Sequence, residues 1–521
     1  MQKKLPVIII LLSFFQLIKA QTEFITIWKP NNTLQCPLLN PQFSAPANNQ
    51  ILFPGIGENY TIKWEEVGYP QHNGSMLDVT SSSPILIDFG PSLNPNLAEA
   101  TYMLIVSNGN GIFKQIKFSD DIILPDPIFE IPNSKAIGSA NKIVEITQWG
   151  NIQWTDMKSA FSQCGLLNIT ATDSPDLSHI TDASMMFYNT TSLEGNSSMA
   201  NWDTSRIKNF KYMFGRGTSS FLGADNFSPP IGTWDMSAAE DISYMFMKRK
   251  SFNENLNNWN TSTIANMAYT FAECTAFNQP LDQWNTSKVK NMAYMFHFIP
   301  NFNQPLNTWN TSNVTNMGHM FHDVSSFNYP LNLWDVSNVT EMNTMFSGAS
   351  AFNQTLKDWN IKSLYSASSM ITKTGMDCGS YSTTLYGWAN HQDTPNNVVL
   401  GSVFPSPYSI DPSVIDARNI LLNTKGWIFI GDTPTECKGL GTMESSLRNQ
   451  PAIFPNPVDE VIQLKNFYNP TRYLIFDTTG KLVTKDDVSK TFINVQSLAK
   501  GNYILQVMTK DKNYTFKFIK K

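Results

Sequence analysis

Apolar residues recur at a fixed interval of 25 positions through the middle of the chain. Between residues 234 and 359, each unit places a tryptophan, a leucine and a phenylalanine in the same register, while the residues between them vary. A period between 20 and 50 residues is typical of a solenoid, whose stacked units share one hydrophobic interior. The columns expected to form this interior are Trp234, Trp259, Trp284, Trp309, Trp334 and Trp359, together with Phe246, Phe271, Phe296, Phe321 and Phe346.

The spacing inside one unit predicts two elements. In the unit at residues 286–310, one group of apolar residues follows the i, i+3, i+6, i+7 pattern of a helix face, and Ser287 is a suitable N-cap. Residues 302–309 contain a central proline and are expected to be extended. Each coil is therefore predicted to have one extended segment and one short helix. The residues of the predicted helix face are Val289, Met292, Met295 and Phe296.

Looser copies of the unit precede residue 234, and a degraded copy follows residue 359. Terminal repeats of a stack are expected to be atypical because they cap it. Two polar columns keep the same period, one directly after the tryptophan and one after the phenylalanine at position 252. Asparagine and aspartate at such positions are expected to satisfy turn backbone groups. The columns are Asp235, Asn260, Asn285, Asn310, Asp335 and Asn360, and Asn253, Asn278, Asn303, Asn328 and Asn353.

One stretch of the unit varies freely. Residues 297–300 read HFIP, residues 322–325 read HDVS, and residues 347–350 read SGAS. Variation confined to one edge of a repeat array is typical of a binding surface, although unconstrained solvent loops explain it equally well. We refer to these three segments as the binding edge. Its candidate contact residues are His297, Phe298, His322 and Asp323.

The first 20 residues predict a signal peptide. Two lysines precede a short apolar run that is too short to span a membrane, and a small residue, Ala20, precedes the expected cleavage point. In an oxidising compartment cysteines can pair, and the count of five leaves at least one unpaired. Cys378 and Cys437 are the first candidates for a disulfide, whereas Cys164 and Cys274 fall inside repeats and are expected to be buried thiols.

Composition narrows the function classes. The formal net charge is −5 and charged residues make up 15% of the 521-residue chain, below the usual ~25%. This balance argues against nucleic acid as a partner, and no further apolar run predicts a membrane span once the signal is removed. No phosphate-binding loop, dinucleotide fingerprint or nucleophile elbow is present. We therefore expect no enzymatic activity, no catalytic residues and no cofactor.

Three histidines fall close together in the repeat register. His297 and His322 occupy one column in successive units, and His319 lies three residues before His322. Three imidazoles could converge on a metal, but Asp323 is the only acidic residue nearby in these columns, so structural histidines are the favoured interpretation and no metal is predicted. The tryptophans could stack on sugars, but an unbroken column at the repeat period is expected to be core.

The repeats resemble those of bacterial BspA-like leucine-rich repeat surface proteins. The resemblance lies in ITQWGNIQWTDMKSAFSQCGLLNI at 146–169, SPDLSHITDASMMF at 174–187 and the WNTSNVTNMGHMF units, and extends to YSTTLYGWAN at 381–390 and ARNILLNTKGW at 417–427. FITIWKP at 24–30 and NYTIKWEE at 59–66 resemble the β-domain that precedes such repeats, without its usual Asp-Gly turn. This family implies display on the cell surface and adhesion or protein–protein contact.

The tail carries a second resemblance. FPNPVDEVIQL, YLIFDTTGKLV, INVQSLAKGNYILQV and YTFKFIKK, within residues 454–521, are similar to the type A C-terminal sorting domain of the type IX secretion system in Bacteroidetes. Alternating apolar residues at 473–476 and 503–507, with a turn at 478–480, predict a small β-sandwich. The resemblance implies contact with the secretion machinery, export across the outer membrane and removal of the tail.

The predicted fold is an α/β repeat solenoid, similar to leucine-rich repeats, flanked by an N-terminal β-rich domain and a C-terminal β-sandwich. The expected segments are a signal peptide (1–20), the β-rich domain (21–135), the solenoid (136–373), a cap and linker (374–445) and the sorting domain (446–521). The favoured function is adhesion or protein binding at the cell surface, with an unidentified surface protein or glycan as partner. A carbohydrate-binding or enzyme-accessory role of residues 21–135, and a purely structural role, remain open.

Overall fold

The computed structural model describes most of the chain after residue 21. The predicted signal peptide and Cys36 lie outside the described residues. The chain divides into two units, residues 1–408 with 416–434 and residues 409–415 with 435–521. The described residues are 22–32, 46–119, 135–217, 225–437, 452–454, 456–465, 467, 470–478, 481–488, 491–509 and 513–521.

The first unit begins with a seven-stranded sheet. In β6 (Tyr102–Ser107) every second side chain is buried, so one face packs on the core. The strand order is β4-β3-β6-β1-β8-β9, with β7 paired to β3, and β2 pairs with β5 separately. The other bounds are β1 (Phe24–Trp28), β2 (Gln50–Phe53), β3 (Gly55–Glu66), β4 (Tyr69–Ser81), β5 (Ile85–Asp88), β7 (Ile112–Ile116), β8 (Ile143–Gln148) and β9 (Asn168–Ile169), with a 3-10 turn η1 (Leu97–Glu99).

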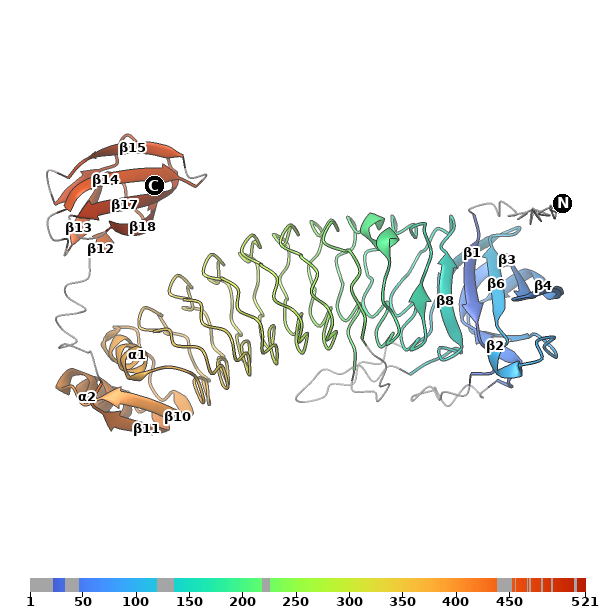
Figure 1. Ribbon diagram of the computed structural model, residues 1–521, viewed down its shortest axis with the longest axis horizontal. Coiled ribbons are helices and arrows are strands. Elements are labelled where there is room, and N and C mark those ends of the chain that lie inside the picture. The colour runs from blue at the N-terminus through green and yellow to red at the C-terminus, as the bar shows by residue number, and fades with distance from the viewer. Residues whose placement is uncertain are drawn as a thin grey trace, which may run out of the picture. The chain divides into compact units, whose positions relative to one another are not determined.

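Strand β8 connects this sheet to the repeats. It pairs antiparallel with β1 and parallel with β9. Parallel bridges then continue from repeat to repeat, for example between Asn266 and Asn291 and between Asn291 and Asn316. The repeats lie side by side between β8 and α1 in Figure 1. The boundary expected between residues 135 and 136 does not separate two cores, because one hydrophobic cluster runs from Phe24 to Phe429.

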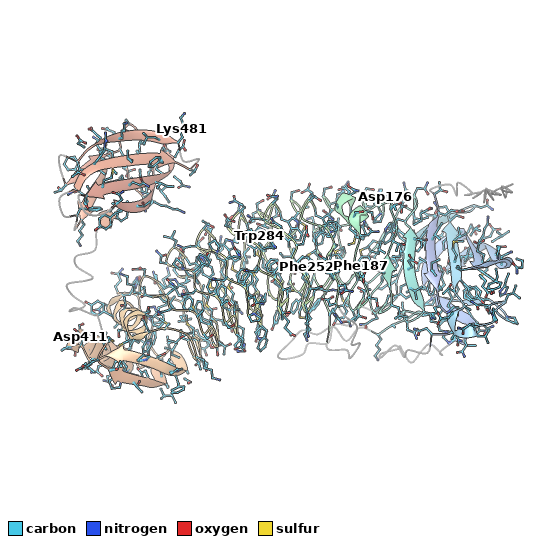
Figure 2. The ribbon with its side chains drawn as sticks, in the orientation of Figure 1. Asp176, Phe187, Phe252, Trp284, Asp411 and Lys481 are labelled. Carbon is cyan, nitrogen blue, oxygen red and sulfur yellow. The ribbon has the colours of Figure 1, made fainter. Side chains whose placement is uncertain are left out.

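The predicted aromatic columns form the interior of the repeats. Every tryptophan and phenylalanine of these columns is at most 3% exposed. Each ring stacks on its equivalent in the next repeat, with centroids 6.4 Å apart for Trp284 and Trp309 and 5.6 Å apart for Phe296 and Phe321. Figure 2 shows how densely side chains fill this region around Trp284. No single repeat has enough surface to bury these rings, so neighbouring repeats stabilise one another.

The prediction of a short helix in each repeat is wrong. Residues 293–298 form consecutive turns, with a positive φ of 59° at Tyr294 and 55° at Phe298. Alternate N–H groups donate to the next repeat: Phe296 to the Met320 carbonyl at 3.1 Å and Phe298 to the His322 carbonyl at 2.9 Å. A helix would direct these donors to carbonyls four residues earlier. Residues 225–373, all of which are described, contain no helix and no named strand, so the α/β class does not hold for these repeats.

The two polar columns are confirmed as structural. Asn285 Oδ1 accepts a hydrogen bond from the Ser287 N–H at 3.0 Å, within one turn. Asn303 Oδ1 accepts from the Asn328 N–H at 3.1 Å, in the next repeat. The first column therefore closes turns, and the second column links repeats.

Helix α1 (Cys378–Asn390) follows the last repeat. Asp377 caps it by accepting from the Ser380 N–H at 2.8 Å. Trp388 is buried and donates to the Leu356 carbonyl at 3.1 Å, so α1 covers the end of the repeat interior. The elements after α1 are β10 (Val399–Ser409), α2 (Pro412–Asn419), the π-helical turn η3 (Ile420–Thr424) and β11 (Ile428–Thr435), and a 3-10 helix, η2 (Ser197–Asn201), lies in an earlier repeat.

The second unit holds two antiparallel sheets on one core. Ile462, Ile475 and Leu505 are buried in it from three different strands. The strand orders are β12-β13-β16 and β15-β14-β17-β18. The expected strands at 473–476 and 503–507 are confirmed, and residues 479–480 of the expected turn lie outside the described residues. The bounds are β12 (Ala452–Phe454), β13 (Val461–Lys465), β14 (Pro470–Asp477), β15 (Leu482–Asp487), β16 (Phe492–Asn494), β17 (Gly501–Thr509) and β18 (Asn513–Lys520). Among the described residues, none of the helices has the length and apolar character needed to cross a membrane.

Candidate functional site

The binding edge consists of turns whose backbone is held by the neighbouring repeat. The turn residues at 294–299 alternate between donating an N–H to the next repeat and donating one inside their own turn. His297 N–H, for example, donates to the Tyr294 carbonyl at 3.1 Å, whereas Phe298 N–H donates to the next repeat. Equivalent side chains are therefore placed directly beside one another along the array.

The structure separates the predicted edge residues by depth. Ile299 and Val324 are fully buried and belong to the core, so the segments 297–300 and 322–325 do not face solvent along their whole length. His297 is only 5% exposed, whereas Phe298 is 41% exposed. The side chain of Asp323 is 43% exposed. The turns direct side chains alternately inward and outward, and a sequence window does not reveal this.

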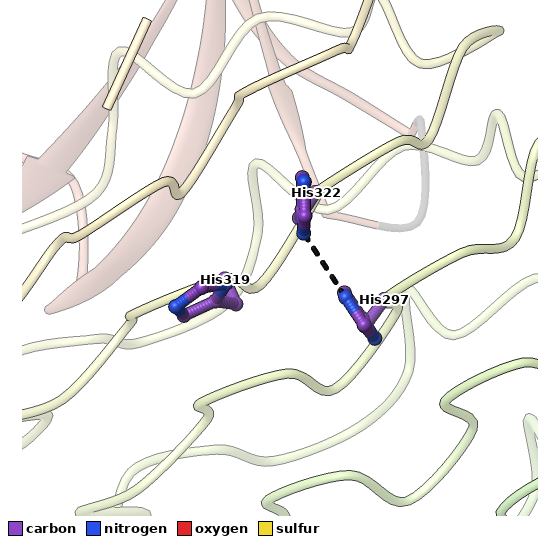
Figure 3. A group of neighbouring side chains, drawn as sticks. All are labelled: His297, His319 and His322. Atoms are coloured by element: carbon purple, nitrogen blue, oxygen red, sulfur yellow. Dashed lines mark hydrogen bonds between the residues drawn. The ribbon is translucent and has the colours of Figure 1, made fainter. Parts of the chain in front are cut away.

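Three histidines meet behind this surface (Figure 3). His297 Nε2 lies 3.0 Å from His322 Nδ1 in a hydrogen bond between repeats. The His319 ring centroid lies 6.2 Å from that of His297 and 5.5 Å from that of His322. One nitrogen from each of the three residues lies within 4.8 Å of the others. The three histidines therefore converge as their repeat register allowed, although the sequence analysis favoured a structural role for them.

Neighbouring side chains orient these rings. The Tyr294 ring stacks on His319 at a centroid distance of 4.1 Å, nearly parallel. The Thr344 hydroxyl is hydrogen-bonded to His319 Nδ1. Asp323 Oδ2 lies 3.4 Å from His322 Nε2. His319 and His322 therefore each have a polar side chain at one ring nitrogen, Thr344 at His319 Nδ1 and Asp323 at His322 Nε2.

The cluster favours neutral imidazoles. Burial, followed by the neighbouring His322 and His319, lowers the pKa of His297 from its ordinary 6.5 to about 3. Burial, followed by His322, lowers the pKa of His319 to about 4. Burial also lowers the pKa of His322, although Asp323 opposes the shift. At neutral pH each ring therefore carries an unprotonated nitrogen.

A column of stacked tyrosines leads into the cluster, and the sequence interpretation missed it. Tyr244 and Tyr269 stack at 4.4 Å, Tyr269 and Tyr294 at 4.2 Å, and Tyr294 then stacks on His319. The tyrosines pack with nearby methionine and alanine side chains in a cluster separate from the main interior. The signal was present as a tyrosine two residues before the phenylalanine in consecutive units, with His319 replacing it in the next.

A cavity of about 240 Å³ lies in the N-terminal sheet region. Its wall near Ser92 is held by the buried Glu66 carboxylate, which accepts from the Leu93 and Asn94 N–H groups, both at 2.9 Å. Burial alone would raise the pKa of Glu66, but hydrogen bonds from Ser92, His72 and these two N–H groups lower it. Lining residues include Pro30, Asn31, Asn49, Pro91, Leu97 and Tyr102.

The cysteines follow the expected division. Cys378 and Cys437 are both disulfide-bonded, and a bond between the two stays the prediction made from the sequence. Cys164 and Cys274 are buried thiols in the repeats. Burial raises the pKa of the Cys274 thiol well above its ordinary value, which disfavours the reactive thiolate.

Comparison with known protein families gives two matches. Residues 155–280, 216–311 and 281–383 are similar to the family described as Mycoplasma protein of unknown function, DUF285. No curated protein matches the chain. Residues 452–521 match the secretion system C-terminal sorting domain. The chain thus joins repeats similar to a family of unknown function to a type IX sorting domain, and the protein is secreted to the outer surface.

Proposed function

We propose that this protein is a surface-displayed adhesin or protein-binding scaffold whose repeats form a solenoid of the BspA-like, leucine-rich-repeat type. The sorting domain supplies export to the surface. The continuous aromatic interior and the parallel bridges between repeats support the solenoid. Partners are a surface protein or a glycan, bound along the binding edge. The proposal assigns the chain no catalytic step.

One column of residues carries this proposal. The residue two after the interior phenylalanine, or after Ile371 in the last unit, has a positive φ in six successive units, between 55° and 76°. Glycine and asparagine adopt this conformation most readily, and bulky residues do so at a cost. Only one of the six is glycine, and side chains of different charge and size occupy the others. We call this set the variable column: Lys248, Glu273, Phe298, Asp323, Gly348 and Lys373.

Phe298 is the member of the variable column that points most directly to binding. Its φ of 55° disfavours a bulky side chain, and the ring is 41% exposed. The ring packs against His297 and His322, with centroids 4.1 and 5.3 Å away, and the rest of it is exposed to solvent. Aromatic residues, including phenylalanine, are enriched at the cores of protein interfaces. A partner that covers Phe298 would supply the missing burial.

The test uses a substitution that a neighbouring repeat already contains. Phe298→Gly reproduces Gly348 and relieves the unfavourable φ, so the melting temperature should stay the same or rise. The secreted chain, with and without this change, is probed on arrays of surface proteins and of glycans. We expect at least a tenfold loss of affinity for the partners that the unmodified chain binds.

The matched control is Tyr365→Ser, which removes another exposed aromatic ring, 82% exposed, outside the variable column. This variant should bind like the unmodified chain. Equal binding by Phe298→Gly and the unmodified chain would remove the edge from consideration and leave the structural role.

The cavity near Tyr102 favours a second candidate, a carbohydrate site in the N-terminal sheet region. Amide side chains such as Asn31 and Asn49 can hydrogen-bond sugar hydroxyl groups, and the volume of about 240 Å³ suits a small ligand portion. Asn49→Ala should then abolish glycan binding on the array while Phe298→Gly leaves it unchanged. The reverse pattern would favour the binding edge.

A further inference from the structure

We propose that His297, His319 and His322 bind a divalent transition-metal ion. Neutral imidazole is the most frequent protein ligand for such ions, and three histidines with an open fourth position form a well-known class of zinc coordination. This proposal does not depend on the adhesive role, because the site lies within one chain and needs no partner.

The distances suit one shared ion. Zinc-to-nitrogen bonds of 2.0–2.1 Å place two tetrahedral ligands about 3.4 Å apart. His297 Nε2 and His322 Nδ1 lie 3.0 Å apart, and one nitrogen of each of the three rings lies within 4.8 Å of the others. The ion would replace the hydrogen bond between the two rings.

Asp323 and Thr344 orient the rings of His322 and His319. Polar groups at the second nitrogen of metal-bound histidines do the same. Asp323 Oδ2 lies 3.4 Å from His322 Nε2, the nitrogen on the far side from His297. Thr344 binds His319 Nδ1 and leaves Nε2 for the ion. A carboxylate or hydroxyl at the second nitrogen fixes the tautomer and presents the other lone pair. If His297 Nε2–H is the donor in the present pair, its proton moves to Nδ1 when the ion binds, with no net proton release.

Equivalent positions show that the fold does not require histidine here. The position of His319 is tyrosine in the preceding repeat, Tyr294, and the position of His297 is Ala272 in the preceding repeat. The position of His322 is Ser347 in the following repeat. Packing is satisfied by these other residues in the same turns, so a metal explains what packing alone does not.

The ligand set selects the ion. All three ligands are imidazole nitrogens, which suit zinc, cobalt, nickel or copper, whereas calcium and magnesium require oxygen ligands. His297 is buried, while His319 and His322 are half-buried, so the fourth position faces solvent. Water would fill this position in the isolated chain.

Zinc titration by calorimetry tests the proposal on the secreted chain, produced without a histidine tag and first treated with a chelator. We expect about one zinc ion per chain at pH 7.5 and a rise in melting temperature. Cobalt should give a visible absorption band of the intensity typical of four-coordinate sites. Magnesium and calcium should give neither effect.

Substitutions borrowed from neighbouring repeats separate binding from folding. The variants His319→Tyr, His297→Ala and His322→Ser should keep the circular dichroism spectrum and each weaken zinc binding at least tenfold. His179→Ala, which removes an exposed histidine elsewhere in the repeats, should bind zinc normally. Absence of zinc binding by the unmodified chain, or undiminished stoichiometric binding by the folded triple variant, would overturn the site.

Discussion

The indole of Trp309 serves two repeats at once. It is 2% exposed and stacks between the tryptophans of both neighbouring units. Its Nε1–H donates to the Leu281 carbonyl at 2.9 Å, in the preceding repeat. The same bond recurs at Trp334, which donates to the Leu306 carbonyl. One residue type therefore supplies both buried area and a second hydrogen bond to a carbonyl that already accepts from a backbone N–H, as Leu281 does from Trp284 at 3.2 Å.

Replacement of this ring is expected to be costly. Trp309→Ala should lower the free energy of unfolding by about 3–5 kcal/mol, because it opens a cavity in the stacked interior and removes the indole hydrogen bond to the Leu281 carbonyl. Urea unfolding followed by circular dichroism measures the change. Leu333→Ala is the control, since Leu333 is 57% exposed and should shift stability by no more than about 0.5 kcal/mol. Similar losses for the two variants would contradict the stacked interior.

The Cys274 thiol should be inert in the folded chain. It is fully buried, donates to the Phe246 carbonyl at 3.0 Å, and has a raised pKa. Iodoacetamide at pH 8 reacts with thiolates, so native protein should show at least a hundredfold slower labelling of Cys274 than protein in urea. Mass spectrometry of the peptide reports this rate. Rapid labelling of the native chain would mean that the repeat opens locally.

At the scale of the element, the turns show where a sequence pattern misleads. Val289, Met292 and Phe296 have helical spacing, but the spacing only records which side chains point inward. In the structure a row of turns with left-handed residues at Tyr294 and Phe298 gives the same inward set. Backbone donors then bond across repeats instead of along a helix. The pattern therefore predicted the buried residues correctly and the backbone path wrongly.

The second asparagine column offers an element-scale test. Asn303→Ala removes the acceptor for the Asn328 N–H and should cost about 1 kcal/mol. Asn303→Asp keeps an acceptor oxygen and should cost less. Urea midpoints of the two variants give the comparison. Equal losses would show that the side-chain amide group, and not its oxygen, is what matters.

At the scale of the whole molecule, a modular interior predicts that a repeat can be removed. Deleting residues 257–281 takes out one period and joins equivalent positions, so Leu256 is followed by a residue equivalent to Asn257. Stability of repeat arrays is close to a sum of unit and interface terms. The shortened chain should fold with a modestly lower urea midpoint, whereas deleting residues 257–268 should unfold the repeats. Circular dichroism and gel filtration distinguish these results.

The tail should be necessary for reaching the surface. A chain that ends at residue 437 lacks the matched sorting domain, residues 452–521. In a host with a type IX system it should accumulate in the periplasm and not reach the cell surface. Protease accessibility of intact cells measures surface exposure. The repeat-deleted chain is the control for a shortened cargo and should still be exported. Surface display of the truncated chain would contradict the role of the tail.

Much of this architecture could be predicted from the sequence. The period of 25, the aromatic interior, the two polar columns and the sorting tail are local or periodic features, and burial of large apolar side chains leaves few alternatives for them. The repeat register already placed His297, His319 and His322 near one another, whereas the backbone path and the distances between the three rings came from the tertiary structure alone. Both depend on how one repeat sits against the next, because hydrogen bonds between repeats compete with those inside a repeat. Distances of a few ångströms between separate turns follow from that competition and leave no mark on the order of residues.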